Sequence, residues 1–399
     1  MIKLLDLKNH SVIAINQNNY TKEDNYKKVC YLDTDNITNN RINAFLKIDL
    51  TKEKLPSRAK RKCSLNSIIY SSVRPNQRHF GIIKEIPKNF LVSTAFIVID
   101  IIDLKKLDPN YLYYYITQDK ITHYLQRIAE CGTSSYPSIT PLDFLNIKIK
   151  LYPLETQQKI ARTLSILDQK IENNHKINEL LHKILELLYE QYFVRFDFLD
   201  ENNKPYQTSG GKMKFSKELN RLIPSGWSVR FLNHKIVSTY QPKTISKTLL
   251  NDSYSYSVYG GGGIIGRFTE YNHEQSEFII SCRGQCGISY LTLPKSWITG
   301  NAMVIRPTKS YTSKTYLYHT IKKYKLTNYI TGSVQPQITR QNLSTMPILI
   351  PKRKTLNKWN NISSLLWNLI HNNMQSTQTL TVLRDFLLPL LLKQQVKPQ

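Results

Sequence analysis

One stretch of the sequence occurs twice, and this internal repeat limits the possible folds more than any other feature. Residues 136–153 align without a gap with residues 335–352, which lie 199 positions later. The alignment continues into the following residues, where Leu167 matches Leu366. Solenoid repeats have periods of about 20–50 residues, so a period this long indicates a duplicated domain. The chain is therefore predicted to consist of two similar halves.

A long helix is predicted after each copy of the repeated stretch. Between residues 160 and 192, apolar or asparagine side chains recur at alternating spacings of four and three, which is the pattern of a coiled coil. Such a helix needs a partner for its apolar seam. The second copy supplies that partner, and a twofold relation between equal halves predicts an antiparallel pair. The residues expected at this helix–helix or partner interface are Leu167, Asn174, Leu181, Leu188, Leu366, Asn373, Leu380 and Leu387.

The two asparagines of the seam are predicted to face each other. An antiparallel pairing that sets Leu167 against Leu380 places Asn174 opposite Asn373 at the centre. A polar pair in a core position costs stability but is satisfied in only one register, so it would fix how far the helices slide. The alternative is that both asparagines are hydrated positions of a solvated bundle.

These features predict an α+β fold with a pseudo-twofold internal repeat, in which two similar α/β domains are separated by two long antiparallel helices that form a coiled coil. The expected boundaries are residues 1–151 for the first domain, 152–199 for the first helix, 200–351 for a linker and the second domain, and 352–393 for the second helix. Residues 278–291 resemble residues 67–83, with Arg283 over Arg74. Similar strands with different loops suit one scaffold with two different binding surfaces.

The net charge narrows the choice of partner. The chain has 55 lysine and arginine residues against 29 aspartate and glutamate residues, and its formal net charge of +26 is spread along the sequence. A surface this positive repels itself unless it faces a polyanion, and nucleic acid is the commonest polyanion in a cytoplasm. The alternative is a merely basic protein from a lysine-rich proteome. The large excess over acidic residues favours nucleic-acid binding.

Two predicted loops carry side chains that are suited to reading bases. Arg74, Asn76 and Arg78 follow a strand-like run, and Arg283 and Gln285 occupy the corresponding place in the second half. Arginine, asparagine and glutamine can contact guanine or adenine edges with two hydrogen bonds, although phosphate contact is at least as common for any one residue. The residues from which we expect DNA contacts are Arg58, Lys60, Arg74, Asn76, Arg78, Tyr136, Ser138, Arg267, Arg283, Gln285, Gln335 and Gln337.

No catalytic site is expected in this chain. The sequence contains no Pro-Pro dipeptide, and so lacks the Asn/Asp-Pro-Pro-aromatic motif of amino methyltransferases, and it contains no Walker loop. Gly261, Gly263 and Gly266 form a formal GxGxxG, but the β-branched and aromatic residues that follow do not favour the helix of a dinucleotide site. Asp100 and Asp103 lie too close together on one strand to hold a metal between two strands. The scattered cysteines and histidines predict no metal site.

The sequence also predicts a cytoplasmic protein without a membrane segment. No apolar run reaches the ~18 residues that a membrane helix needs. The amino-terminal residues lack the cleavage pattern of a signal peptide.

Several motifs together carry a family resemblance. They are LPSRAKR from Leu55, IIYSSVRPNQRHFG from Ile68, GTSSYPSIT from Gly132, IARTLSILDQKIENN from Ile160, IPSGW from Ile223, YSVYGGGGIIG from Tyr256 and TGSVQPQIT from Thr331. With these motifs, over nearly its full length, the chain resembles the specificity subunit of type I restriction-modification enzymes. It departs from the family pattern in lacking the IPSGW form in the first half, and all four tryptophans lie in the second half.

The resemblance implies a non-catalytic subunit that reads a bipartite, asymmetric site in double-stranded DNA, with one half-site for each target-recognition domain. It also implies two methyltransferase subunits, which bind the helices and methylate adenine, and motor-nuclease restriction subunits, which cleave unmodified DNA. S-adenosylmethionine, ATP and magnesium are then expected only in those partner subunits. Two alternatives are a stand-alone sequence-specific DNA-binding protein that acts as a decoy or regulator, and a scaffold whose charge is incidental.

Overall fold

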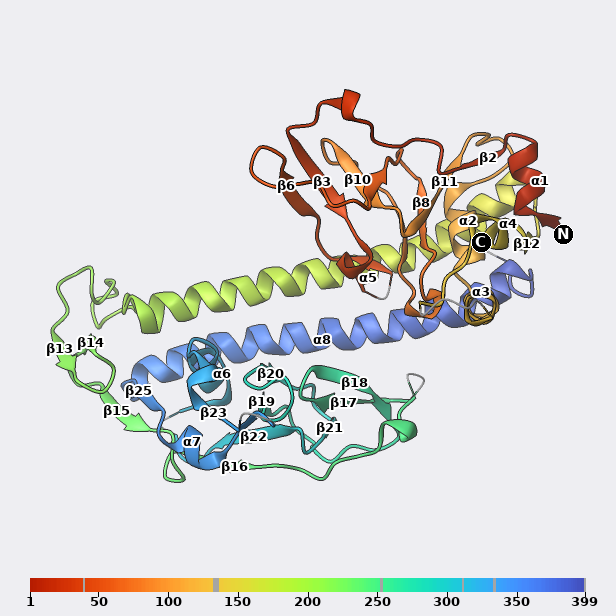
Figure 1. Cartoon of the computed structure of the whole chain (residues 1–399). Coiled ribbons are helices and arrows are strands. Elements are labelled where there is room, and N and C mark those ends of the chain that lie inside the picture. The colour runs from red at the N-terminus through yellow and green to blue at the C-terminus, as the bar shows by residue number, and fades with distance from the viewer. Residues whose placement is uncertain (39, 132–135, 252–253, 311, 333–334, 398–399) are drawn as a thin grey trace. The chain divides into compact units, whose positions relative to one another are not determined.

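The computed structural model describes residues 1–38, 40–131, 136–251, 254–310, 312–332 and 335–397 (Figure 1). The chain divides into two compact units, of which the first contains Met1–Ile171 and Thr379–Gln399 and the second contains Glu172–Gln378. Each unit therefore combines one of the duplicated domains with a stretch of both long helices. Among the described residues, no helix has the length and apolar character required to cross a membrane.

Two four-stranded sheets form the domain of the first unit (Figure 1). All neighbouring strands of one sheet are antiparallel, and its order is β2 (Ile13–Ile15), β11 (Phe96–Ile101), β8 (Ile68–Ser71) and β9 (Phe80–Ile82). The order of the other sheet is β6 (Leu46–Asp49), β3 (Lys28–Leu32), β10 (Phe90–Ser93) and β7 (Ala59–Arg61). Two-stranded pairs join β1 (Ile2–Lys3) to β12 (Lys148–Ile149) and β4 (Ile37–Thr38) to β5 (Arg41–Ile42). The strand β8 is buried on both faces because its residues are all apolar, aromatic or serine.

Four short helices complete this domain, namely α1 (Leu4–Asn9), α2 (Pro109–Ile116), α3 (Asp119–Glu130) and α4 (Pro141–Leu145). The helix α2 begins where Asp108 accepts a hydrogen bond from the Tyr111 N–H at 2.9 Å, with proline at the first helical position. Its tyrosines face the main apolar core of the unit, where Tyr111 is fully buried. The tyrosine-rich face is thus core.

The second unit repeats the first antiparallel sheet. Its order is β16 (Val237–Tyr240), β22 (Ala302–Pro307), β19 (Phe278–Ser281) and β20 (Ser289–Leu291), and all neighbours are antiparallel. The pair of β15 (Ser228–Phe231) with β25 (Pro347–Ile350) repeats the pair of β1 with β12. The helices of this domain are α6 (Lys314–Lys322) and α7 (Arg340–Ser344). The predicted duplication is confirmed because strand order, hairpin position and closing strand pair all recur.

The remaining strands of the second unit differ from those of the first. A three-stranded sheet has the order β18 (Gly263–Phe268), β17 (Tyr256–Gly260) and β21 (Trp297–Ile298). Two antiparallel two-stranded pairs join β13 (Met213–Ser216) to β14 (Arg221–Pro224) and β23 (Ile330–Thr331) to β24 (Gln337–Ile338). The glycine-rich stretch is the turn of the β17–β18 hairpin and is followed by a strand, as its β-branched residues predicted.

The two long helices are α5 (Leu154–Tyr189) and α8 (Arg353–Leu392), and α5 continues into a π-helical turn at Glu190–Val194. In the second unit, Tyr189 lies near Trp359, with ring centroids 5.8 Å apart, and Asn178 accepts a hydrogen bond from Asn373 at 2.9 Å. In the first unit, Arg384 pairs with Asp168 at 2.8 Å and the Tyr152 hydroxyl donates to the Leu392 carbonyl. Within each unit, residues with higher numbers at α5 contact residues with lower numbers in α8. The helices are therefore antiparallel, as predicted.

The predicted pairing of Asn174 with Asn373 is wrong by one helical turn. Asn373 bonds to Asn178, and the Asn174 side-chain amide donates to Thr377 Oγ1 at 3.2 Å. The prediction assumed that the pseudo-twofold axis relating the two halves passes midway between Asn174 and Asn373, which are equivalent positions of the repeat. In the structure the register is shifted by four residues, and Asn178 and Thr377 supply the side-chain hydrogen-bond partners of Asn373 and Asn174. Both asparagines are nevertheless hydrogen-bonded across the helix pair.

Candidate nucleic-acid interface

The candidate interface of the first unit is the loop between β8 and β9, residues 72–79. Arg74 and Arg78 both have left-handed backbone, with φ angles of 47° and 56°, and they flank the 3-10 turn Pro75–Gln77. Residues other than glycine rarely adopt this conformation, and such strain is concentrated at functional sites. The sharp turn buries Pro75 and leaves Arg74 and Asn76 exposed to solvent.

Residues 136–138, at the start of the first copy of the repeated stretch, lie along one side of this loop. The Arg74 guanidinium stands over the Tyr136 ring, 5.5 Å from its centroid, and the Arg74 N–H donates to the Pro137 carbonyl at 2.8 Å. An isolated bridge joins Val73 to Ser138. The structure therefore brings Arg74, Tyr136 and Ser138 together, although 62 residues separate the first two in the sequence.

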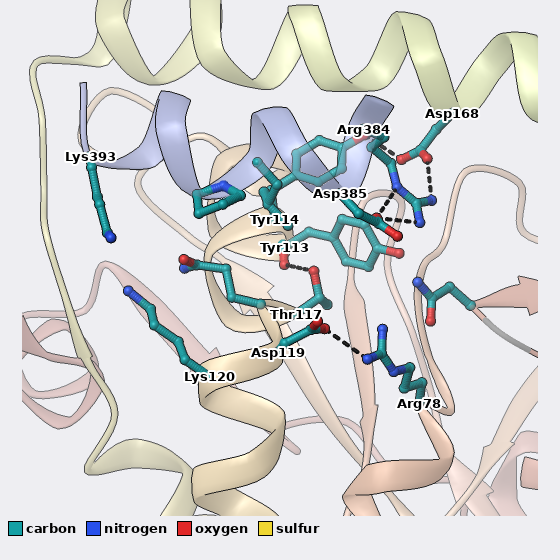
Figure 2. Close-up of a pocket in the computed structure, with 14 residues that line it drawn as sticks. Arg78, Tyr113, Tyr114, Thr117, Asp119, Lys120, Asp168, Arg384, Asp385 and Lys393 are labelled. Atoms are coloured by element: carbon teal, nitrogen blue, oxygen red, sulfur yellow. Dashed lines mark hydrogen bonds and ion pairs between the residues drawn. The ribbon is translucent and has the colours of Figure 1, made fainter. Parts of the chain in front are cut away.

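The opposite side of the loop packs on α3. An Arg78 guanidinium N–H donates to Asp119 at 2.8 Å (Figure 2). The Asn76 backbone N–H donates to the Gln126 side-chain carbonyl at 3.1 Å. Sequence reasoning missed Asp119 and Gln126. They lie 41 and 50 residues from their partners, and no local pattern marks a helix residue that supports a distant loop.

The equivalent loop of the second unit joins β19 to β20, residues 282–288. Arg283 and Gln285 are exposed, and Gly284 and Gly287 have positive φ angles of 72° and 92°. An isolated bridge joins Arg283 to Gln337, matching the bridge between Val73 and Ser138, so Arg283 corresponds in the structure to Val73 and the predicted alignment with Arg74 is wrong by one residue. The Cys286 thiol donates to the Pro336 carbonyl at 3.2 Å. The predicted residues Arg283, Gln285, Gln335 and Gln337 thus gather around a second loop, which glycines bend in place of strained arginines.

Three predicted contact residues lie outside these loops. Arg58 and Lys60 are exposed at β7, an edge strand of the other sheet of the first unit. Arg267 is half-buried in β18, where its guanidinium donates to the backbone carbonyls of Tyr254 and Ser255 at 3.4 and 3.2 Å. DNA contact by these three residues stays a prediction.

A charged pocket of about 170 Å³ lies beside the first loop, between α2, α3 and the two long helices (Figure 2). Arg384 donates to Asp168 and Asp385, each at 2.8 Å, and the Tyr114 hydroxyl donates to Asp168 at 2.6 Å. Burial, reinforced by the charge of Asp168, raises the pKa of Tyr114 well above its usual range, so this hydroxyl remains a hydrogen-bond donor. The network ties the domain of the first unit to its helices.

Metal ligands do not gather in the part of the chain that the structure describes, where no group of three or more histidine, cysteine, aspartate or glutamate side chains is placed to hold an ion. In the charged pocket, Tyr114, Asp168, Arg384 and Asp385 are hydrogen-bonded to one another. Lys120, at its edge, has its pKa lowered by burial and by the nearby charge of Lys393.

Each long helix also carries an apolar stripe of exposed side chains, which recur at spacings of three and four residues within 177–187 of α5 and 362–369 of α8. The predicted seam residues are half-buried, and Leu181 and Leu366 pack against the core of the second unit. Other large apolar side chains of the helices are exposed, with Leu180 at 61% and Leu187 at 58%. The exposed residues are Ile166, Ile177, Leu180, Ile184 and Leu187 on α5 and Ile362, Leu365, Leu369, Val382, Leu383 and Phe386 on α8. Such stripes favour a protein partner.

Comparison with known proteins identifies the family. Residues 8–183 and 224–381 match the type I restriction modification DNA specificity domain, one match for each half of the chain. The chain belongs to this family. The predicted resemblance is confirmed, and the two matched ranges coincide with the repeat that the structure shows.

Individual relatives carry the same description. The type I restriction enzyme HindI specificity subunit of Haemophilus influenzae is 32% identical over 173 residues, which are 43% of this chain and 37% of that subunit. The MjaIX specificity subunit of Methanocaldococcus jannaschii is 24% identical over 314 residues, 70% of this chain and 67% of that subunit. A crystal structure of a type I restriction-modification system S subunit from M. genitalium superposes with a TM-score of 0.57 at 15% identity, covering 98% of this chain and 95% of that one, and so shows the shared fold.

Proposed function

We propose that this chain is the DNA-recognition subunit of a type I restriction-modification complex and has no catalytic activity of its own. It reads a bipartite, asymmetric DNA site, with one half-site for each domain. The observation that carries the proposal is the pair of exposed, arginine-bearing loops on equivalent hairpins of two sheets with the same strand order. Because the loops differ in sequence, the two half-sites differ.

The chemistry of the loops suits base reading. Arg74 and Arg78 in the first unit and Arg283 in the second are side chains that contact guanine with two hydrogen bonds, whereas Asn76 and Gln285 suit adenine. The net charge of +26 supplies contacts to the phosphates, which position the loops over the bases without sequence preference.

The exposed stripes of the helices support the proposed protein partners. Side chains such as Leu180 and Leu187 leave apolar surface in water, and burying it against another subunit is favourable by about 25 cal/mol per Å². We assign these stripes to two methyltransferase subunits that methylate adenine, with motor-nuclease restriction subunits added to that complex. S-adenosylmethionine, ATP and magnesium bind to the partner subunits. The complex acts on DNA in the cytoplasm. A stand-alone binder would leave the stripes uncovered.

Adenine methylation in cells tests this function. Genomic DNA is sequenced for methylated adenine in cells that carry the partner subunits with or without this chain. A two-part motif that appears only with the chain is expected. The purified chain alone should bind DNA with a steep dependence on salt and show neither methyltransferase nor nuclease activity. Activity of the single chain, or methylation without a two-part motif, would contradict the proposal.

A further inference from the structure

The structure points to two residues of α3, Asp119 and Gln126, as positioning residues for the recognition loop of the first unit. They touch no base themselves but hold Arg78 and the Asn76 backbone in the geometry from which the half-site is read. This inference rests on the proposed function, because it concerns how accurately one loop reads its bases.

Asp119 engages one edge of Arg78. The contact joins one terminal guanidinium nitrogen to one carboxylate oxygen at 2.8 Å, and 38% of the Arg78 side chain stays exposed (Figure 2). A guanidinium has five N–H donors in a fixed plane, so a single carboxylate bond restrains the position of the group and leaves other donors for a guanine edge. Functional side chains need such support to keep their geometry.

Gln126 restrains the backbone of the same loop. Its side-chain amide donates to Glu130 at 2.7 Å, and this bond fixes the orientation in which the amide carbonyl accepts from the Asn76 N–H. Asp119 and Gln126 are seven residues apart, so they share one face of α3 and lie about 10.5 Å apart along its axis. The loop is thus held at two separate points.

The conformation of the loop explains why it needs this support. Arg74 and Arg78 both have left-handed backbone, which side chains other than glycine disfavour. Contacts with residues 136–139 hold the Arg74 end, and α3 holds the Arg78 end. Loss of either α3 contact lets the Arg78 end relax into more than one conformation.

The described part of the second unit has no α-helix equivalent to α3. Between α6 and β24, the regular elements among the described residues are the 3-10 turn Leu326–Tyr329, whose Leu326 packs against Gly287 of the loop, and β23. In the loop of that unit, glycines adopt the positive φ angles without strain. The loop is held by the Cys286–Pro336 contact and by a hydrogen bond from the Ser281 hydroxyl to the Gln285 carbonyl. Changes in α3 should therefore affect only the first half-site.

The test uses the full chain with its partner subunits and two variants, Asp119→Asn and Gln126→Leu. Glu53→Gln serves as the control because Glu53 is an exposed carboxylate of the same domain, remote from the loop in sequence. For each protein we would compare binding to the native site with binding to sites changed one base pair at a time. We expect discrimination at one or two base pairs of the first half-site to fall by roughly tenfold. Discrimination in the second half-site and the melting temperature should stay unchanged.

A double-variant cycle separates positioning from a merely structural role. If Asp119 acts through Arg78, then Asp119→Asn should reduce discrimination in the native chain but not in a chain that already carries Arg78→Gln. Asp119→Glu should restore most of the native discrimination. An equal loss with and without Arg78, a loss in both half-sites, or tighter binding with unchanged discrimination would overturn the inference. A native complex that methylates no two-part motif would instead overturn the proposed function.

Discussion

The two units attach the same kind of domain to the same kind of helix with different chemistry. In the first unit, the anchor is polar, with Arg384 between Asp168 and Asp385 and with the Tyr114 hydroxyl on Asp168. In the second unit, His319 of α6 corresponds to Tyr114 of α2, because residues 315–321 (TYLYHTI) resemble residues 110–116 (NYLYYYI).

The anchor of the second unit is aromatic. His319 stacks on Tyr189 at 5.5 Å, and the rings of Phe193, Trp359 and Trp367 pack around them. The contact between domain and long helices can therefore be made in two ways in the same duplicated fold, by hydrogen-bonded charges or by packed aromatic rings. The two anchors should respond differently to truncation, pH and salt.

Truncation of Trp359 should produce the largest effect. The side chain is 1% exposed and touches Tyr189, Phe193 and His319. Trp359→Ala should cost about 3–5 kcal/mol in the unfolding of the second unit, because it leaves a large cavity. Hydrogen exchange of β19 and β22 measures this loss. Trp359→Phe is the control and should retain most of the stability; equal losses for the two variants would show that ring packing is not the anchor.

The second-largest effect is expected from acidification, which should weaken the aromatic anchor. Burial lowers the pKa of His319 to about 3 and that of His371 to about 4, with further contributions from Lys322 to the first and Lys314 to the second. Because both folded values lie below the unfolded value of about 6.5, the unfolded chain binds more protons as the pH falls. Stability is therefore full above pH 6.5 and declines below it, by about 2–3 kcal/mol for each histidine by pH 4.5.

Unfolding of the second unit followed between pH 7 and pH 4.5 checks this decline. His319→Gln should flatten the pH dependence, and the first unit, with Tyr114 at the equivalent position, should lack this component. A pH dependence that is unchanged in His319→Gln would contradict the assignment to this residue.

Breaking the polar anchor should have a smaller effect. Arg384→Met leaves Asp168 and Asp385 without their cation, at a cost of about 2 kcal/mol, because the pair is only partly shielded, with Arg384 19% and Asp168 31% exposed. Hydrogen exchange of β8 and β11 measures the loss. Asp168→Asn combined with Arg384→Met should lose less than the two single variants together, and full additivity would show that the ion pair contributes nothing to the anchor.

Changes in the recognition loops should have the smallest energetic effect and the most local one. Arg74→Ala or Arg78→Ala should weaken the first half-site, and Arg283→Ala or Gln285→Ala the second, by about 1–2 kcal/mol at one base pair for a direct base contact. A lost phosphate contact would weaken all sequences alike. Binding to sites substituted base by base distinguishes the two cases, and a first-unit variant that alters both half-sites would refute independent reading.

The sequence by itself determined the architecture. The match of residues 136–153 with 335–352 established the duplication, and the heptad pattern established the two long helices. Both are patterns of spacing along the chain, and burial of an apolar face depends on that spacing. The sequence also supplied the individual residues Arg74, Tyr136, Arg283 and Gln337 as candidates for DNA contact, but not their pairing, which only the structure shows.

The tertiary structure alone decided the details that depend on distant side chains. It paired Asn373 with Asn178 and not with Asn174, bonded the Arg267 guanidinium to the Tyr254 and Ser255 carbonyls, and set Asp119 and Gln126 against the first loop. These contacts join residues far apart in the sequence, and they depend on side-chain size and direction in the packed state. Sequence spacing specifies which face of an element is buried, but only three-dimensional packing specifies what that face meets.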